Sequence, residues 1–311
     1  MRWIHQRGYD YGRGIPFLRE VHGFVLDKPG RIRAKLVAGG VPPRAFEAPG
    51  AVDEADLAAI HTPEVLAGLK DAGALATAVE LPPLARLPAA LVRHMVVRPQ
   101  LLASGGTALA MRLAAAGHWV ANLGGGFHHA RPDLSHGFCL VNDVAWGVHC
   151  LRRDGDSSRV LVLDLDLHQG DGNAEAFQGR DDVFTASLHQ EDTFPIPKAT
   201  SDLDVGLVGG TVSDAVYRDA LDDLLAQVAE RFAPQIVVHV AGTDVHEDDG
   251  IGSFGLTADG VVARDRRVAR FAAEHGAGLV VLPAGGYSRV SPELAAAGFA
   301  AVAEVDAQRT G

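Results

Sequence analysis

The segment from Val160 to Asn173 constrains the fold more than any other part of the chain. It begins as an uninterrupted apolar run, as in a strand that is buried on both faces of a parallel sheet. It then turns acidic, and Asp164, Asp166 and His168 occupy alternate positions, which would place them on one face of a strand. Burying three such side chains is costly without an opposing charge. A divalent cation is the simplest opposing charge, because carboxylate and imidazole groups are good zinc ligands.

Short apolar runs alternate along the chain with segments of helical periodicity. This alternation predicts an α/β fold with a mostly parallel sheet and helices on both faces. Several runs end in Gly, Asp or His, so the reactive side chains should gather at the carboxyl edge of the sheet. The expected strands are 119–123, 160–166, 183–188, 235–241 and 278–283, and the expected helices are 100–116, 212–232, 257–275 and 291–304.

The length and net charge of the chain narrow the choice of domain organisation and of binding partner. A chain of 311 residues can form one large α/β domain or two small ones. We see no repeat, low-complexity tract or linker in it, so we expect one domain over residues 1–311. The net charge is −11. Because nucleic-acid-binding proteins normally carry a basic face, we expect no direct binding of nucleic acid.

The cysteines and the N-terminal segment bear on the compartment. The chain has two cysteines, Cys139 and Cys150, so a reducing compartment is favoured over a disulfide framework. The first ten residues lack the apolar core of a signal peptide. No apolar run is long enough to span a bilayer. We therefore expect a cytoplasmic protein that is not embedded in a membrane.

A second acidic segment follows the expected strand 235–241. It is rich in glycine and carries Asp244, Asp248 and Asp249, each of which is a possible metal ligand. Taken alone, such a segment is more often an ordinary surface loop. Two or three ligands from one strand rarely surround an ion, however, so this loop is the clearest source of a further ligand.

A third candidate site runs from Gly124 to Ala130, where three glycines precede two adjacent histidines. Glycines at a strand end let the backbone approach a ligand closely. The segment lacks the P-loop lysine and the glycine spacing of dinucleotide-binding proteins. His128 and His129 suit proton transfer beside a metal, because imidazole titrates near neutral pH. Each needs a carboxylate to fix its tautomer, and Asp164 and Asp171 are available.

The fourth candidate is Tyr287, which follows the expected strand 278–283 and a pair of glycines. A tyrosine hydroxyl at a strand end is well placed to stabilise a developing oxyanion. The alternative is a tyrosine that only packs against its neighbours. The three nearby candidate sites favour the catalytic interpretation.

Five segments of the chain, in their order and spacing, resemble the zinc-dependent histone deacetylase superfamily, which includes acetylpolyamine amidohydrolases and acetoin-utilisation proteins. The resemblance extends from about residue 61 to residue 301. It implies an arginase/deacetylase-like three-layer αβα fold and a single deacetylase-like catalytic domain. The five segments are Gly124–Ala130, Gly137–Asp143, Asp164–Asp171, Asp244–Thr257 and Gly285–Tyr287.

Within the superfamily, the chain most resembles the class IV, bacterial histone deacetylase-like branch. Gln169 follows His168, where most other branches have a second histidine. Residues 22–24, with Lys28, resemble a His-Pro-Phe-Asp segment in which Gly23 replaces the proline.

The resemblance implies one catalytic zinc ion held by Asp166, His168 and Asp249. We place the third ligand at Asp249 by its register with the Ser-Phe pair and the threonine that follow in this loop. Iron(II) can replace zinc in such sites.

The resemblance also implies the catalytic groups around the metal. His128 and His129 would be the tandem active-site histidines. Asp164 would orient His128, and Asp171 would orient His129. Tyr287 would donate a hydrogen bond to the carbonyl oxygen of the substrate.

A substrate channel and a second ion are implied in the same way. Phe138, Phe194 and Gly126 would line the channel for the acyl group. A structural potassium ion would lie under the strand. Its ligands would be Asp164, Asp166, Ser187 and the backbone of His168 and Leu188.

The implied function is zinc-dependent removal of acyl groups from N-acyl-lysine in a peptide or protein, as in histone deacetylases. The alternative is a small-molecule deacylase that acts on an acetylpolyamine or another small N-acyl amine. A non-catalytic acyl-binding module is less favoured, because every expected catalytic position is filled. An arginase-like hydrolase with two metal ions is also less favoured, because Tyr287 and the adjacent histidines match a single-zinc site.

Overall fold

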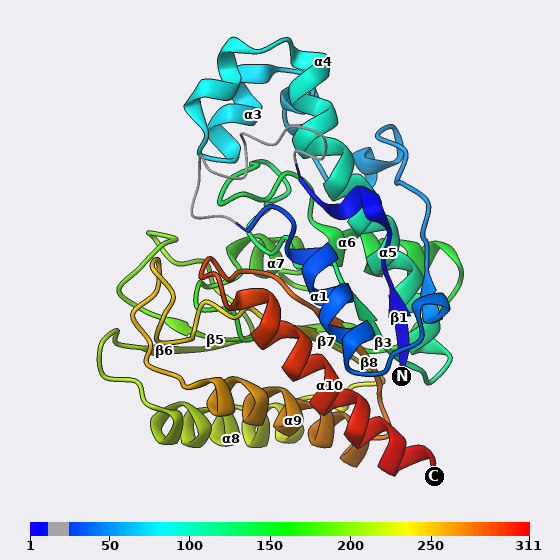
Figure 1. The fold of residues 1–311 in the computed structure, drawn as a ribbon, viewed down its shortest axis with the longest axis vertical. Helices are drawn as coiled ribbons and strands as arrows, with labels where there is room; N and C mark the ends of the chain where they lie inside the picture. Colours follow the sequence, from blue (N-terminus) through cyan, green and yellow to red (C-terminus); the bar gives the residue numbers. More distant parts are fainter. Residues whose placement is uncertain (12–24) are drawn as a thin grey trace.

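The computed structural model describes residues 1–11 and 25–311. Within these residues, eight parallel strands form one sheet (Figure 1). The strands are β1 (Arg2–Ile4), β2 (Phe46–Glu47), β3 (Trp119–Asn122), β4 (Val160–Asp164), β5 (Val183–Gln190), β6 (Leu203–Leu207), β7 (Ile236–Val240) and β8 (Gly278–Leu282). Their order across the sheet is β2-β1-β3-β8-β7-β4-β5-β6.

Helices cover both faces of this sheet, which gives the three-layer αβα architecture that the sequence predicted. The α-helices of the described residues are α1 (Lys28–Ala38), α2 (Pro63–Gly68), α3 (Ala72–Ala78), α4 (Ala89–Val92), α5 (Arg98–Ala115), α6 (Asp143–Arg153), α7 (Asp171–Ala176), α8 (Asp214–Arg231), α9 (Ala258–Glu274) and α10 (Ser291–Thr310). One face carries α1, α8, α9 and α10, and the other carries α5 and α6. The short helices α3 and α4 lie at one end of the molecule, at the top of Figure 1.

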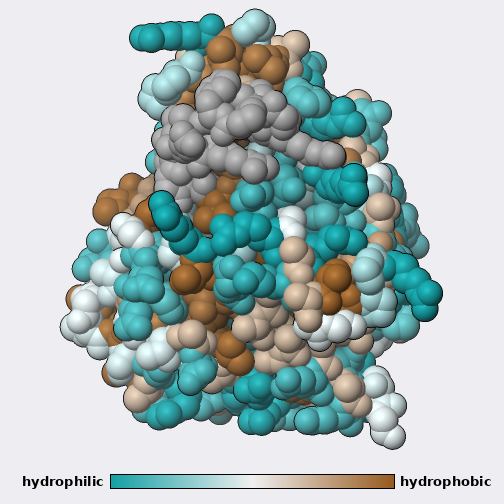
Figure 2. Space-filling model, viewed as in Figure 1, coloured by the Kyte–Doolittle hydropathy of each residue, from teal (hydrophilic) through white to brown (hydrophobic). Residues whose placement is uncertain are grey.

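The alternation of side chains along the strands explains the two cores. In β4, Leu161 and Leu163 pack into the core beneath α8, α9 and α10, whereas Val160 and Val162 pack into the core beneath α5 and α6. This is the expected period of two for a strand that is buried on both faces. Hydrophilic side chains cover most of the outer surface in the view of Figure 2, with hydrophobic side chains in small separate patches.

The structure corrects one part of the strand prediction. β4 ends at Asp164, and Asp166 and His168 lie in the bend that follows it, so the three side chains do not share one face of a strand. The amide of Asp166 donates to the carboxylate of Asp164 at 3.3 Å rather than to a neighbouring strand. The acidic side chains thus end the ladder by competing for its backbone donors.

The carboxyl ends of four adjacent strands meet at one edge of the sheet. The glycines after β3, the acidic bend after β4, the loop after β7 and the Gly-Gly-Tyr segment after β8 all lie there, because β3, β8, β7 and β4 are consecutive in the sheet. Parallel topology therefore brings all four candidate sites together. The segment at residues 22–24 lies outside the described residues. Among the helices of residues 1–11 and 25–311, none is long and apolar enough to cross a membrane.

Candidate active site

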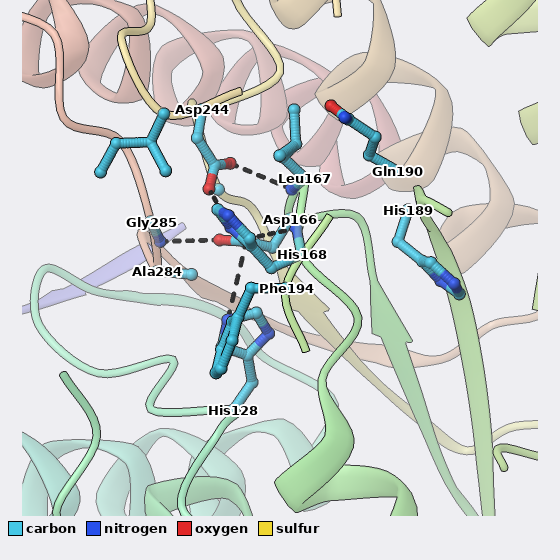
Figure 3. A network of polar contacts seen from close by, with 12 residues as sticks. His128, Asp166, Leu167, His168, His189, Gln190, Phe194, Asp244, Ala284 and Gly285 are labelled. Carbon is cyan, nitrogen blue, oxygen red and sulfur yellow. Dashed lines mark hydrogen bonds and ion pairs between the residues drawn. The ribbon is translucent and has the colours of Figure 1, made fainter. Parts of the chain in front are cut away.

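Three buried side chains form a candidate metal site at this edge. Asp166, His168 and Asp244 place one ligand atom each within 4.8 Å of the others. Figure 3 shows the three side chains pointing toward one another, with Gly285 and His128 beside them. Two carboxylate oxygens and one imidazole nitrogen are a donor set that suits zinc and its neighbours in the first transition row.

The third member of this cluster is Asp244, whereas the sequence-based prediction places the third ligand at Asp249. Asp244 directly follows the Gly-Thr pair at the end of β7, and its carboxylate lies 3.1 Å from the Nδ1 atom of His168. The carboxylate of Asp249 instead accepts backbone N–H groups from Tyr287 at 2.7 Å, Ser288 at 3.2 Å and Ile251 at 3.1 Å. The geometry therefore favours Asp244 over Asp249 as the third ligand, because the Asp249 carboxylate is occupied by the loop after β8.

Backbone donors fix both carboxylates of the cluster. The Gly285 amide donates to Asp166 at 2.8 Å, and the Leu167 amide donates to Asp244 at 3.0 Å. A Cβ atom at Gly285 would lie 2.4 Å from Asp244 and 2.5 Å from Asp166. Only glycine allows the backbone to come this close to the two acids.

The charges in the cluster are unbalanced. Burial would raise the pKa of Asp166, but the charge of His128 and the hydrogen bond with His168 lower it well below its usual range. Burial and the charge of Asp166 raise the pKa of Asp244 to about 6. Burial would lower the pKa of His168, but its contacts with Asp166 and Asp244 raise it to about 10. Without a metal, two carboxylates thus hold a proton on the imidazole between them, and a bound divalent cation would replace that proton and supply positive charge.

The two adjacent histidines each contact one carboxylate, as the sequence suggested. The Nδ1 atom of His128 lies 2.9 Å from Asp164, the last residue of β4. The Nδ1 atom of His129 lies 2.7 Å from Asp171, the first residue of α7. All four side chains are buried, and the centres of the two imidazole rings are 4.0 Å apart. Each histidine therefore contacts its carboxylate through Nδ1, and the Nε2 atom of His128 lies 3.7 Å from Asp166.

The electrostatic environment distinguishes the two histidines. Burial would lower the pKa of His128, but the charges of Asp164 and Asp166 raise it to about 9. Burial and the charge of His128 lower the pKa of His129 to about 3, although Asp171 opposes this change. Without a bound cation, His128 is therefore the charged imidazole and His129 the neutral one, which is the form that can accept a proton.

Tyr287 lies beside the metal cluster at the end of the Gly-Gly-Tyr segment. The centre of its ring is 6.4 Å from that of His168 and 5.8 Å from that of Phe138. Burial and the charges of Asp244 and Asp166 raise its pKa well above the usual value. The phenol thus stays protonated and can donate a hydrogen bond.

The predicted channel residues lie around these groups. The Phe194 ring is 4.9 Å from His129 and 37% exposed, so it stands at the mouth of the site. Phe138 adopts a φ angle of 65°, and its amide donates to the Ala78 carbonyl. Gly126 has a φ angle of 83°, and a Cβ atom there would lie 2.8 Å from Ala284. Phe138 and Gly126 line a pocket together with His128, His129 and Tyr287, whereas Phe194 does not line it.

Two residues that support the site were not predicted from the sequence. Asp143, at the start of α6, accepts the amides of Gly126 and Phe127 and so shapes the loop that carries the two histidines. Lys28 is 7% exposed, and its Nζ atom donates to the carbonyls of Pro283, Ala284 and Gly285. Both residues lie in segments singled out for the resemblance, but only the fold shows which loops they hold.

A protein family and several known proteins match most of the chain. The histone deacetylase domain family matches residues 26–303. Histone deacetylase 2 of Arabidopsis thaliana is 32% identical over 299 residues, which are 94% of this chain and 76% of the relative. The histone deacetylase-like amidohydrolase of Pseudomonas aeruginosa is 34% identical over 173 residues, 52% of this chain and 45% of the relative. The acetylpolyamine aminohydrolase of Burkholderia pseudomallei shares the fold, with a TM-score of 0.76 at 22% identity over 98% of this chain and 99% of that one.

Proposed function

The chain belongs to the histone deacetylase family of metal-dependent amide hydrolases, and we propose that it removes acyl groups from N-acyl-lysine side chains. One observation carries this proposal. The candidate metal cluster, two histidines that each contact a carboxylate, and a protonated tyrosine lie together at one edge of the sheet. These are the groups that hydrolysis of an amide needs around the reacting carbonyl.

The proposed metal is one zinc ion held by Asp166, His168 and Asp244, and iron(II) suits the same donors. When bound, the ion supplies a Lewis acid that polarises the acyl carbonyl and acidifies a water molecule. Asp249 keeps a separate task in this proposal, because it holds the backbone of Tyr287.

The side chains of the protein move and hold the protons. His129, kept neutral by burial, takes the proton of the attacking water at its Nε2 atom and returns it to the nitrogen of the leaving amine. Asp171 orients His129, and Asp164 orients His128, which stabilises the charge that develops beside it. Tyr287 donates its hydroxyl hydrogen to the carbonyl oxygen as negative charge builds up there.

The proposal also includes the structural potassium ion. Asp164 and Ser187 are buried and lie opposite each other in the pairing of β4 with β5, which supports a shared cation at that point. Its ligands would be Asp164, Asp166, Ser187 and the backbone of His168 and Leu188. The midpoint of thermal unfolding should then be higher in potassium chloride than in an equal concentration of tetramethylammonium chloride.

The substrate proposal is an acylated lysine in a peptide or protein, whose extended side chain would pass between Phe138 and Phe194 and along Gly126. The acetylpolyamine aminohydrolase with the same fold supports an alternative, in which the substrate is a small N-acyl amine. Both substrates present a linear amide at the end of an alkyl chain, so the channel alone does not separate them.

A panel of substrates tests the proposal. Purified protein would be incubated with fluorogenic acyl-lysine peptides from acetyl to myristoyl and with acetylpolyamines, each with and without a hydroxamate chelator. Turnover of the peptides that the hydroxamate abolishes is expected. Turnover of acetylpolyamines alone would move the assignment to the small-molecule alternative. A protein that is loaded with zinc and hydrolyses no member of the panel would refute the proposal.

A further inference from the structure

We infer that His136 is a positioning residue for this reaction, because it contacts the carboxylate oxygen of Asp171 that His129 leaves free. The inference rests on the proposed function. Asp171 Oδ1 lies 2.7 Å from Nδ1 of His129, and Asp171 Oδ2 lies 2.9 Å from Nε2 of His136. One buried carboxylate therefore bridges two imidazole rings, one in the site and one at its rim.

The character of the second contact defines what His136 does. The nitrogen and oxygen atoms are at ion-pair distance, but the N–H group is not aligned as in a hydrogen bond. The contact therefore acts on Asp171 through the polar edge of the imidazole ring, without an aligned hydrogen bond. Burial would raise the pKa of Asp171, but the contacts with His129 and His136 together lower it below its usual range. His136 thus helps to keep this buried carboxylate ionised.

Holding Asp171 from both sides has a consequence for His129. A carboxylate that is contacted through one oxygen can rotate about its Cβ–Cγ bond, and the imidazole that depends on it then rotates too. A carboxylate held at both oxygens keeps the His129 ring in one orientation, with Nε2 directed into the site. Orientation of this kind matters because displacing a catalytic group by about 1 Å can cost about 100-fold in rate.

His136 also touches the wall of the channel, and this second contact must be separated from the first. The centre of its ring is 5.4 Å from Phe194 and 5.9 Å from His129, and its side chain is 21% exposed. Glu175 of α7 adds a nearby negative charge and is itself paired with Arg131 at 2.9 Å. A purely structural His136 would act through its ring, whereas a positioning His136 acts through Nε2.

Two substitutions distinguish these possibilities. His136→Phe keeps a ring against Phe194 but removes the nitrogen that contacts Asp171. His136→Gln removes the ring but keeps an amide N–H₂ group at the position of Nε2. We expect His136→Phe to lower kcat about tenfold with KM within about twofold, as for other residues that orient a catalytic group. We expect His136→Gln to keep kcat within about twofold of the parent.

The opposite pattern would overturn the inference. If His136→Gln loses as much kcat as His136→Phe, or if His136→Phe changes only KM, the residue serves the channel wall and does not position Asp171. The matched control is His149, a half-buried histidine of α6 that stacks on Trp146. His149→Phe and His149→Gln should leave kcat unchanged, and urea unfolding of all four variants shows whether each one is folded.

A measurement that needs no turnover separates this inference from the proposed function. The proton on Nδ1 of His129, held by Asp171, should give a downfield proton resonance in NMR spectra of the purified protein. His136→Phe should move or broaden this resonance, and His136→Gln should leave it near its original position. If the parent protein hydrolyses no substrate, the proposed function fails, and this resonance alone decides the inference. An unchanged resonance in His136→Phe would overturn it.

Discussion

Two clusters of buried charge lie near the carboxyl ends of β4 and β7. They differ in whether their charges balance. The site cluster consists of Asp166, His168 and Asp244. The brace cluster consists of His239 on β7 with Arg264 and Asp265 on α9, all of them buried. The Asp265 carboxylate lies 2.9 Å from both the Nε2 atom of His239 and the Nε atom of Arg264.

The charges of the brace cluster balance within the protein. Burial would raise the pKa of Asp265, but the charge of Arg264 lowers it, so the two form a buried ion pair. The other end of Arg264 donates from Nη1 to the carbonyls of Leu165, at 3.1 Å, and Gly242, at 2.5 Å. Burial lowers the pKa of His239, so this imidazole stays neutral and adds no charge to the brace cluster.

The brace cluster contacts the backbone that lies next to the acids of the site cluster. Leu165 immediately precedes Asp166, and Gly242 lies two residues before Asp244. Arg264 therefore fixes the two loops that supply the carboxylates of the site cluster. The comparison teaches that a balanced buried cluster serves as a rigid support, whereas surplus negative charge favours the binding of a cation from outside the chain.

The largest expected effect separates the two loop acids. Asp244→Asn should lower the affinity for zinc by more than about 100-fold, since even residues that only orient a ligand typically contribute 10- to 100-fold. Asp249→Asn should keep zinc bound and lose turnover through the Tyr287 loop. Competition with a fluorescent chelator measures both affinities. A variant of Asp249 that loses zinc while the variant of Asp244 keeps it would restore the ligand set expected from the sequence.

Removing the positive charge of the brace cluster should destabilise the whole protein. Arg264→Met leaves Asp265 buried beside a neutral partner, so we expect a loss of about 3–5 kcal/mol in the free energy of unfolding. Urea unfolding followed by circular dichroism gives this value. Arg264→Met combined with Asp265→Leu should lose less than Arg264→Met alone. If the single variant loses under about 1 kcal/mol, Arg264 is not the support that we describe.

Tyr287→Phe tests the chemistry of the site cluster without altering its charge. Turnover should fall about 100-fold, as when one donor to a developing oxyanion is removed. Bound zinc, measured by atomic absorption, should remain at the level of the parent protein. Full activity in this variant would mean that Tyr287 does not donate to the substrate carbonyl.

The smallest expected effect concerns pH and the brace cluster. Burial lowers the pKa of His239, so below a pH of about 6.5 the unfolded chain binds a proton that the folded protein does not. Stability is therefore lost as the pH falls below that value, by at most about 1.4 kcal/mol per pH unit for this one group. His239→Gln cannot titrate and should show a shallower loss. Equal slopes for both proteins in urea unfolding between pH 7 and pH 5 would exclude His239 as the titrating group.

Much of the fold could be predicted from local patterns. The five expected strands are present, because each is a compact apolar run that parallel packing buries on both faces. β1 and β2 escaped prediction because runs of three and two residues carry no periodic signal. β6 was not predicted because only its first residue is buried and the others are half-buried or exposed. It therefore has no continuous apolar run.

The contacts of the candidate site likewise include some that could be predicted from the sequence and one that could not. The contacts of His128 with Asp164 and of His129 with Asp171 could be anticipated from the resemblance, because all four residues lie in the segments that carry it. The third member of the site cluster could not. Asp244, Asp248 and Asp249 share one loop, and their chemistry is identical. The choice among them depends on which carboxylate the loop after β8 occupies, and that loop lies 38 residues away in the sequence from Asp249.

The sequence by itself determined the parallel αβα architecture, the position of the site at the carboxyl edge of the sheet, and the kinds of side chain in it. These follow from short-range patterns, since apolar runs set the strands and polar residues end them. Only the tertiary structure decided that Asp244 joins Asp166 and His168, that Asp249 holds the Tyr287 loop, and that His136 shares Asp171 with His129. These relations depend on distances of a few ångströms between loops from different strands. Packing of the whole sheet and its helices fixes those distances, and no single segment of the chain contains them.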